Sequence, residues 1–176
     1  DDDFGTIVAA IGHGRAIFAN IRKFVVYLLS CNISEVLVVS IATIAGAPLP
    51  LLPLQILFLN LVTDVFPALA LGVGPGQTSL MKVQPRSPSE RILMRRHWME
   101  IGLYGIVMAL VVLSAMAISV RYLDFERQQA VTVAFCTLAL AQLWHVFNMR
   151  SDLARLVNNE ITRNVWIWLA LVLCLI

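Results

Sequence analysis

The chain has 176 residues, of which 59% are hydrophobic and 14% are charged, and its mean hydropathy is +0.81. A soluble domain carries about a quarter charged residues, so the composition excludes an ordinary soluble domain. It indicates an all-α membrane protein with several transmembrane helices in a lipid bilayer. The formal net charge of +2 says little by itself, and we expect no nucleic-acid partner.

The predicted elements begin with a cytoplasmic stalk helix over residues 1–23. Its apolar side chains fall near one side of a helix, and no proline or turn cluster separates it from the apolar run that follows. Four complete transmembrane spans are predicted at about 24–45, 53–72, 98–120 and 130–148. A fifth apolar run, 165–176, is shorter than the roughly 20 residues of a span, and we interpret it as the start of a further helix. The chain is therefore expected to be cut at its end.

The basic residues predict the orientation of these spans. If the stalk is cytoplasmic, only Arg121 and Arg127 of the 13 basic residues lie on the outer side, as the positive-inside rule requires. The polar loops 74–97 and 149–164 are then cytoplasmic. In the third span, Gly102 and Gly105 are expected to let a second helix pack closely.

The three cysteines lie within apolar runs, without the paired spacing of a zinc site or a disulfide framework. We expect them to be buried free thiols. They are Cys31, Cys136 and Cys174.

Asp64 lies in the middle of the second span, and a carboxylate at that depth usually marks an ion or proton pathway. Asn60 and Thr63 precede it by four residues and one residue, so the three side chains share a helix face. Pro67 has no N–H to donate to the carbonyl of Thr63 and leaves that oxygen free. The pattern predicts oxygen ligands directed at one centre.

The first span carries a second carboxylate, Glu35, with Asn32 three residues before it on the same face. A short turn joins the first two spans, so these polar groups are expected to meet at similar depth. Carboxylate, amide, hydroxyl and backbone oxygens suit a hard cation such as Ca²⁺, and also Na⁺ or a proton relay. The alternative is a set of interhelical hydrogen bonds that only holds helices together. In the fourth span, Gln142 is a weaker candidate for ion contact, and His145 is interpreted as a packing or interfacial residue.

Several ordered motifs resemble P-type cation-transporting ATPases. Asp2-Asp3-Phe4-Gly5-Thr6-Ile7-Val8, followed by Gly14-Arg15-Ala16-Ile17, resembles the segment after their phosphorylation domain. Asn60-Leu61-Val62-Thr63-Asp64, with Pro67-Ala68 and Leu71-Gly72, resembles the sixth transmembrane helix of the calcium-pump branch. Pro85-Arg86-Ser87-Pro88 resembles the loop that follows it.

The resemblance implies that the spans are the fifth to eighth transmembrane helices and the start of the ninth. It implies that the cation ligands are Asn32, Glu35, Asn60, Thr63 and Asp64. The two-calcium pumps carry a glutamate in the eighth helix where this chain has Gln142, which makes one ion per cycle plausible. The stalk is implied to transmit motion from the phosphorylated domain.

The expected function is the ion-site portion of an ATP-driven pump that exports Ca²⁺ from the cytoplasm in exchange for protons. Aspartyl phosphorylation elsewhere in the parent chain would drive alternating access, and ATP and Mg²⁺ would bind only in the missing domains. The phosphorylation and nucleotide-binding motifs are not in these residues, so this segment alone should not hydrolyse ATP. Its expected partners are the missing actuator, phosphorylation and nucleotide domains and the first four helices.

Two alternatives stay open. One is a P-type pump for Mn²⁺, Mg²⁺ or Na⁺, since the ligands are generic among hard cations. The other is a truncated, non-catalytic membrane module that associates with an intact pump. The expected location is the plasma membrane, which is the inner membrane if the source is bacterial, with an endomembrane as the alternative.

Overall fold

The computed structural model describes residues 4–74, 81, 84, 90–151 and 159–175. These residues form helices and their connections, with no strand among them, which confirms the predicted all-α fold. The motif residues Asp2, Asp3 and 85–88 lie outside the described part of the chain.

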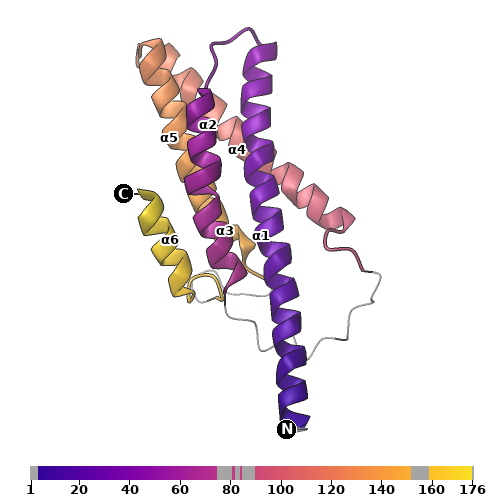
Figure 1. The fold of residues 1–176 in the computed structure, drawn as a ribbon. Coiled ribbons are helices and arrows are strands. Elements are labelled where there is room, and N and C mark those ends of the chain that lie inside the picture. Colours follow the sequence, from indigo (N-terminus) through magenta and orange to yellow (C-terminus); the bar gives the residue numbers. More distant parts are fainter. Residues whose placement is uncertain (1–3, 75–80, 82–83, 85–89, 152–158, 176) are drawn as a thin grey trace.

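The first helix, α1, runs without a break from Phe4 to Ile44, because no proline interrupts it. It contains both the expected stalk and the first span, and its amino-terminal part extends beyond the other helices (Figure 1). The apolar residues Ile7 and Ile11 are 53% and 48% exposed, so the rest of this chain does not cover that side of the stalk. After α1 the chain reverses at Gly46, whose φ of +65° favours glycine.

The second span consists of three consecutive helical segments. These are α2 (Pro53–Phe58), a π-helical turn η1 (Leu59–Thr63) and α3 (Val65–Gly72). In the π turn, the amide of Asp64 donates to the carbonyl of Leu59, five residues earlier, at 2.9 Å. The sequence predicted a regular helix here, so this widened turn is a finding of the structure. Single π turns within α-helices are frequently found at functional sites.

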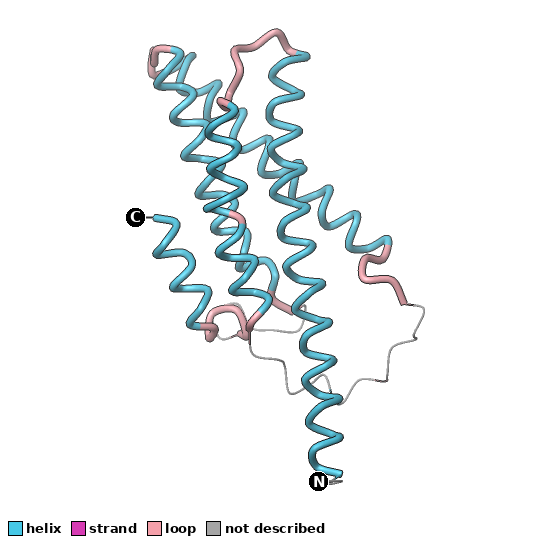
Figure 2. Tube along the Cα trace, viewed as in Figure 1, coloured by secondary structure: helices cyan, strands magenta, loops and turns pink. Residues whose placement is uncertain are grey.

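The remaining helices are α4 (Arg95–Tyr122), α5 (Arg127–His145), the short 3₁₀ turn η3 (Val146–Met149) and α6 (Val165–Leu175). Within the described residues, four helical segments are long and apolar enough to cross a membrane, as predicted; α6 is shorter. Figure 2 shows the connections at the two ends of the bundle. The fold is that of an integral membrane protein with several spans.

The helices pack around two apolar clusters with the candidate polar site between them. One cluster includes Tyr27 and Ile101, and the other includes Val38 and Val112. The long helices α1 and α4 cross closely where a Cβ on Gly105 would lie 2.6 Å from Cγ2 of Ile33. Gly105 therefore permits the close contact that was expected. Gly102 does not, because a Cβ there meets nothing within 4 Å.

The cysteines are free, but they are not equally buried. Cys31 is buried and Cys174 is partly buried, whereas Cys136 is exposed. The expectation of a buried thiol was wrong for Cys136, because this residue lies on the side of α5 that faces away from the other helices of this chain.

Candidate ion site within the membrane

Glu35 joins three helical segments through its carboxylate. Its Oε2 accepts a hydrogen bond from Nδ2 of Asn60 at 2.9 Å, and its Oε1 accepts one from Nε2 of Gln142 at 2.9 Å. Glu35 is 4% exposed and Gln142 is fully buried. The structure therefore brings the first-span carboxylate, the π-turn amide and the fourth-span amide into direct contact.

Thr63 and Asp64 end the π turn, and both are buried, at 2% and 1% exposure. Pro67 has no N–H, so the carbonyl of Thr63 receives no helical hydrogen bond from that position. Instead, the hydroxyl of Tyr27 lies 3.4 Å from this carbonyl and 3.3 Å from the backbone carbonyl of Gln142. A hydroxyl has one proton and donates to one of these oxygens at a time.

Asn32 is placed differently from the other predicted ligands. It is exposed in this chain, and its Nδ2 donates to the carbonyl of Leu28 at 2.8 Å. Three residues on an α-helix are separated by about 60° around the axis, which is enough to place Glu35 inside the bundle and Asn32 at its surface. The structure brings together Glu35, Asn60 and Gln142 but does not bring Asn32 to them.

Three buried oxygens at this site accept no hydrogen bond from an N–H or O–H group of the described residues. They are Oδ1 and Oδ2 of Asp64 and Oε1 of Gln142. The thiol of Cys31, a weak donor, is the side chain that interacts with Asp64. Buried polar atoms are almost always satisfied, and leaving one unpaired costs about 1–3 kcal/mol. Unpaired oxygens on a carboxylate and an amide are suitable ligands for a hard cation. Within the described residues, no three His, Cys, Asp or Glu side chains form a cluster, so the arrangement differs from a zinc-type site.

His145 lies next to this set but has a packing environment. Its ring stacks on Tyr27 with the centroids 5.7 Å apart and contacts the ring of Tyr104 at 4.5 Å. Its Nδ1 is 3.2 Å from Nδ2 of Asn148. The packing interpretation made from the sequence agrees with this placement.

The site also contains a residue that sequence reasoning missed. Tyr27 is fully buried and contacts backbone oxygens of two predicted ligands. It precedes Glu35 by eight residues, a spacing that places both on one face of a helix. This spacing could have identified Tyr27 as part of the site. It was missed because a tyrosine in an apolar run was not considered as a polar residue.

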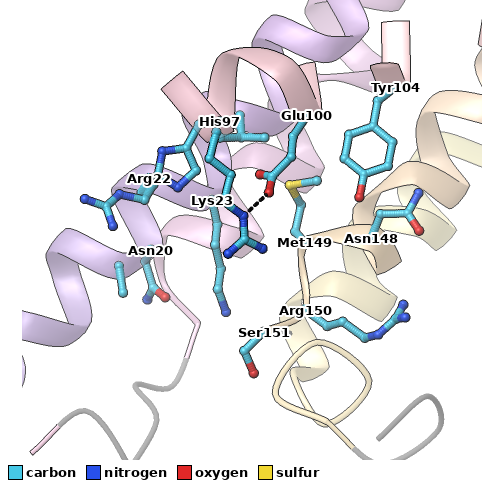
Figure 3. Close-up of a pocket in the computed structure, with 13 residues that line it drawn as sticks. Asn20, Arg22, Lys23, His97, Glu100, Tyr104, Asn148, Met149, Arg150 and Ser151 are labelled. Atoms are coloured by element: carbon cyan, nitrogen blue, oxygen red, sulfur yellow. Dashed lines mark hydrogen bonds and ion pairs between the residues drawn. The ribbon is translucent and has the colours of Figure 1, made fainter. Parts of the chain in front are cut away.

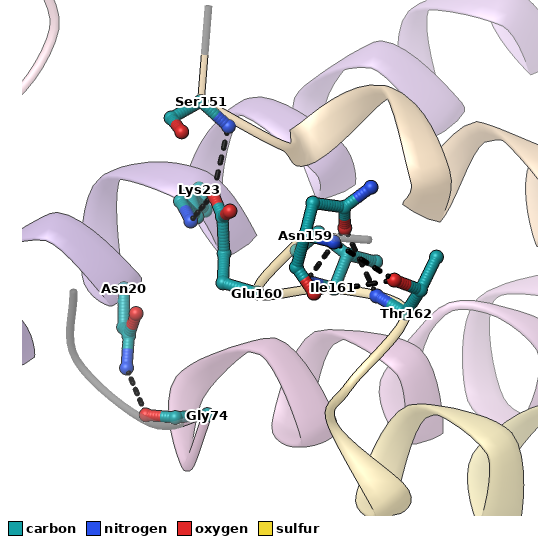
Figure 4. A network of polar contacts seen from close by, with 8 residues as sticks. All are labelled: Asn20, Lys23, Gly74, Ser151, Asn159, Glu160, Ile161 and Thr162. Carbon is teal, nitrogen blue, oxygen red and sulfur yellow. Dashed lines mark hydrogen bonds and ion pairs between the residues drawn. The ribbon is translucent and has the colours of Figure 1, made fainter. Parts of the chain in front are cut away.

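At residues 20–23, the end of the expected stalk is attached to the neighbouring connections by polar contacts (Figure 4). Nδ2 of Asn20 donates to the carbonyl of Gly74 at 2.7 Å. Nζ of Lys23 donates to Oε1 of Glu160 at 2.9 Å, and the amide of Ser151 donates to the same oxygen at 2.7 Å. Burial alone would raise the pKa of the Glu160 carboxyl, but these hydrogen bonds and the charge of Lys23 hold it below its ordinary value.

The fold thus defines a membrane protein whose helices enclose carboxylate, amide and hydroxyl groups. Residues 48–176 match the family described as "Cation transporting ATPase, C-terminus", and the chain belongs to this family. It is 43% identical to a calcium-transporting ATPase of Bacillus subtilis over 152 residues, which cover 86% of this chain and 17% of that protein. It is 33% identical to calcium-transporting ATPase 1 of Bacillus cereus over 188 aligned residues, covering 98% of the chain and 21% of the relative.

A third relative is named for a different ion. The chain is 49% identical to a P-type sodium-transporting ATPase4 of Plasmodium falciparum over 107 residues, 61% of this chain and 8% of the relative. The chain therefore spans about a fifth of the length of the two calcium-transporting relatives, in agreement with the predicted carboxy-terminal membrane portion.

Proposed function

We propose that this chain is the ion-binding membrane portion of an ATP-driven pump that exports Ca²⁺ from the cytoplasm in exchange for protons. The remainder of the pump supplies the actuator, phosphorylation and nucleotide domains and the first four transmembrane helices. ATP and Mg²⁺ bind in those domains. The pump resides in the plasma membrane, and its aspartyl phosphorylation changes the side of the membrane from which the site is open.

The observation that carries this proposal is the buried oxygen set on α1, η1 and α5. Asp64 has two buried carboxylate oxygens without an N–H or O–H donor among the described residues, with only the weakly donating thiol of Cys31 beside them, and Gln142 has one buried amide oxygen without a donor. Glu35 lies beside them in contact with both Asn60 and Gln142. A cation would satisfy the unpaired oxygens, and its removal would favour protonation of the carboxylates, because two buried negative charges repel each other.

The ligands have different assigned roles. Glu35 and Asp64 supply charge, whereas Asn60, Thr63 and Gln142 supply neutral oxygens. Asn32, exposed on α1 in this chain, joins the site from the side that the first four helices cover. A single neutral amide at position 142 in place of a carboxylate favours one Ca²⁺ per cycle, since calcium affinity depends on the number of charged ligands.

Na⁺ is a second candidate for the transported ion. It is supported by the relative from Plasmodium falciparum, which is named as a sodium-transporting ATPase. A monovalent ion also requires fewer carboxylates than Ca²⁺, and only two are present in the set of Glu35, Asn60, Thr63, Asp64 and Gln142.

The test is phosphoenzyme formation from ATP by the full-length pump, titrated separately with Ca²⁺, Mn²⁺, Mg²⁺ and Na⁺. We expect Ca²⁺-dependent labelling in the wild type and its loss in Asp64→Asn and Glu35→Gln, because each change removes a negative ligand without changing the size of the side chain. Expression should be normal. The matched control is Glu126→Gln, which neutralises a carboxylate in the exposed turn between α4 and α5.

The two ions give different results. Labelling that requires Na⁺ and ignores Ca²⁺ would replace the first candidate with the second. Ion dependence that survives both Asp64→Asn and Glu35→Gln would show that this polar set only holds helices together.

A further inference from the structure

A cavity of about 330 Å³ lies beside residues 19–26 in the middle of α1, between α4 and the segment that follows α5 (Figure 3). It is separate from the candidate ion site. Its polar lining is rich in donors, and its inner wall is apolar. Val26 and Met149 in that wall are 5% and 6% exposed, and Tyr104 lies next to them.

The charged side chains of the cavity are mostly basic. Arg22, Lys23, Arg96 and Arg150 line it, against one lining carboxylate, Glu100. Three of the four basic residues also have a carboxylate partner, in the pairs Arg22–Glu90, Lys23–Glu160 and Arg96–Glu100 at 2.8, 2.9 and 2.8 Å. The four basic residues and the three carboxylates together leave a net charge of +1.

Lys23 and Arg22 have more N–H donors than these ion pairs use. Glu160 takes one of the three N–H donors of Lys23. Arg22 uses Nε for the carbonyl of Ile92 and Nη2 for Glu90, while a guanidinium has five donors. Arg150 comes from a different segment and faces the same space. Donors from α1 and from the segment after α5 therefore converge on one volume.

Two exposed tryptophans close to the cavity indicate its level relative to the bilayer. Trp98 follows the lining residue His97 and is 53% exposed. Trp144 lies at the carboxyl end of α5, next to the segment that lines the cavity, and is 69% exposed. Exposed tryptophans are enriched at the level of the lipid headgroups. A basic opening above an apolar wall at this level matches the two halves of a phospholipid, with its charged headgroup and its apolar glycerol and acyl region.

We propose that this cavity is a binding site for a phosphate-bearing anion, presented as the headgroup of an anionic phospholipid from the cytoplasmic leaflet. Arg150, Lys23 and Arg22 bind the phosphate, and Val26, Tyr104 and Met149 contact the glycerol end of the acyl chains. The bound lipid joins α1 to α4 and to the segment after α5. The inference does not depend on which cation the pump transports.

The experiment is native mass spectrometry of the full-length pump in a neutral detergent, with phosphatidylglycerol or phosphatidylcholine added in equal amounts. The variants are Arg150→Gln and Lys23→Gln. The matched control is Arg95→Gln, because Arg95 is an exposed basic residue at the start of α4 that does not line the cavity. A second arm adds glycerol phosphate, the soluble headgroup without acyl chains.

We expect the wild type and Arg95→Gln to retain phosphatidylglycerol in preference to phosphatidylcholine. Arg150→Gln should weaken that retention about fivefold, the effect of one basic residue near an anionic surface. Equal retention of the two lipids, or no difference between Arg150→Gln and Arg95→Gln, would overturn the proposal. Glycerol phosphate that binds as tightly as the lipid would also overturn it, by identifying a soluble anion as the ligand.

Discussion

Gln142 is the residue that distinguishes this site from one with three carboxylates. Its Nε2 donates to Oε1 of Glu35 at 2.9 Å, and its own Oε1 accepts nothing from the described residues. The amide thus fixes Glu35 in position while offering one neutral oxygen. A carboxylate at position 142 could not donate this hydrogen bond, so its presence would change both the charge and the geometry of the site.

We therefore predict that Gln142→Glu raises the apparent Ca²⁺ affinity of the full-length pump and makes the response steeper. Two carboxylates in direct contact repel each other unless a cation or a proton lies between them, so the substitution favours the occupied state. The expected gain is about tenfold in apparent affinity. The measurement is a Ca²⁺ titration of phosphoenzyme formation.

Gln142→Leu is the control for this prediction, because it removes the donor to Glu35 without adding charge. It should not reproduce the gain. If the glutamate and leucine variants gave the same titration curve, charge at position 142 would have no role in ion binding.

For individual residues, the sequence was sufficient to predict which polar side chains lie within the spans, but not which of them form hydrogen bonds with one another. The apolar surroundings of Glu35 and Asp64 made them conspicuous. Their partners depend on side-chain directions across three helices, which one-dimensional spacing does not determine. This is why Asn32 was grouped with Glu35. Tyr27 was missed for another reason, because a tyrosine in an apolar run was not considered as a polar residue.

At the scale of the helices, α1 and α4 pack tightly at Gly105, where there is no room for a side chain. A methyl group there would lie 2.6 Å from Cγ2 and 3.3 Å from Cβ of Ile33, and 3.5 Å from the carbonyl of Ser30. The neighbouring Gly102 faces open space on the same helix. The two glycines look equivalent in the sequence and differ only in which side of α4 they occupy.

Gly105→Ala should therefore destabilise the protein by about 1–3 kcal/mol, the usual cost of overpacking a tight contact. Gly102→Ala should be neutral or slightly stabilising, because it gains helix propensity without a clash. The measurement is thermal unfolding of the purified full-length pump in detergent. Adding Ile33→Ala to Gly105→Ala should restore part of the loss, since it removes the atom that is struck. Equal melting temperatures for the two single variants would contradict the close contact.

The helices could be predicted from the length of the apolar runs and from the charged residues and prolines between them. The π turn over Leu59–Thr63 did not, because a change from four-residue to five-residue hydrogen bonds leaves the same apolar pattern. What the π turn alters is the direction of Thr63 and Asp64, which become buried while Leu61 stays 63% exposed. The candidate site thus depends on a backbone feature that composition does not encode.

Across the whole molecule, the stalk is attached to three separate connections within four residues of α1. Asn20 bonds the end of α3, Arg22 bonds Glu90 before α4, and Lys23 bonds Glu160 before α6. The stalk therefore has a direct hydrogen bond to each of the three connections at this level. We infer that these contacts couple the proposed phosphorylation-driven motion of the stalk to the end of the second span, which carries Asp64, and to the segments that precede α4 and α6.

The link between Lys23 and Glu160 should make stability depend on pH. The Glu160 carboxyl has a pKa below its ordinary value of 4.5, so the link contributes stability above that pH. The contribution is lost as the pH falls through the lower value of the folded protein. Glu160→Gln should reduce stability by about 1 kcal/mol at neutral pH, and its melting temperature should converge with that of the wild type in acid. Asp124→Asn, in the exposed turn after α4, is the control and should follow the wild type at every pH, because asparagine tolerates the positive φ of this position. A constant difference between Glu160→Gln and wild type from neutral to acidic pH would show that the charge of Glu160 does not stabilise this link.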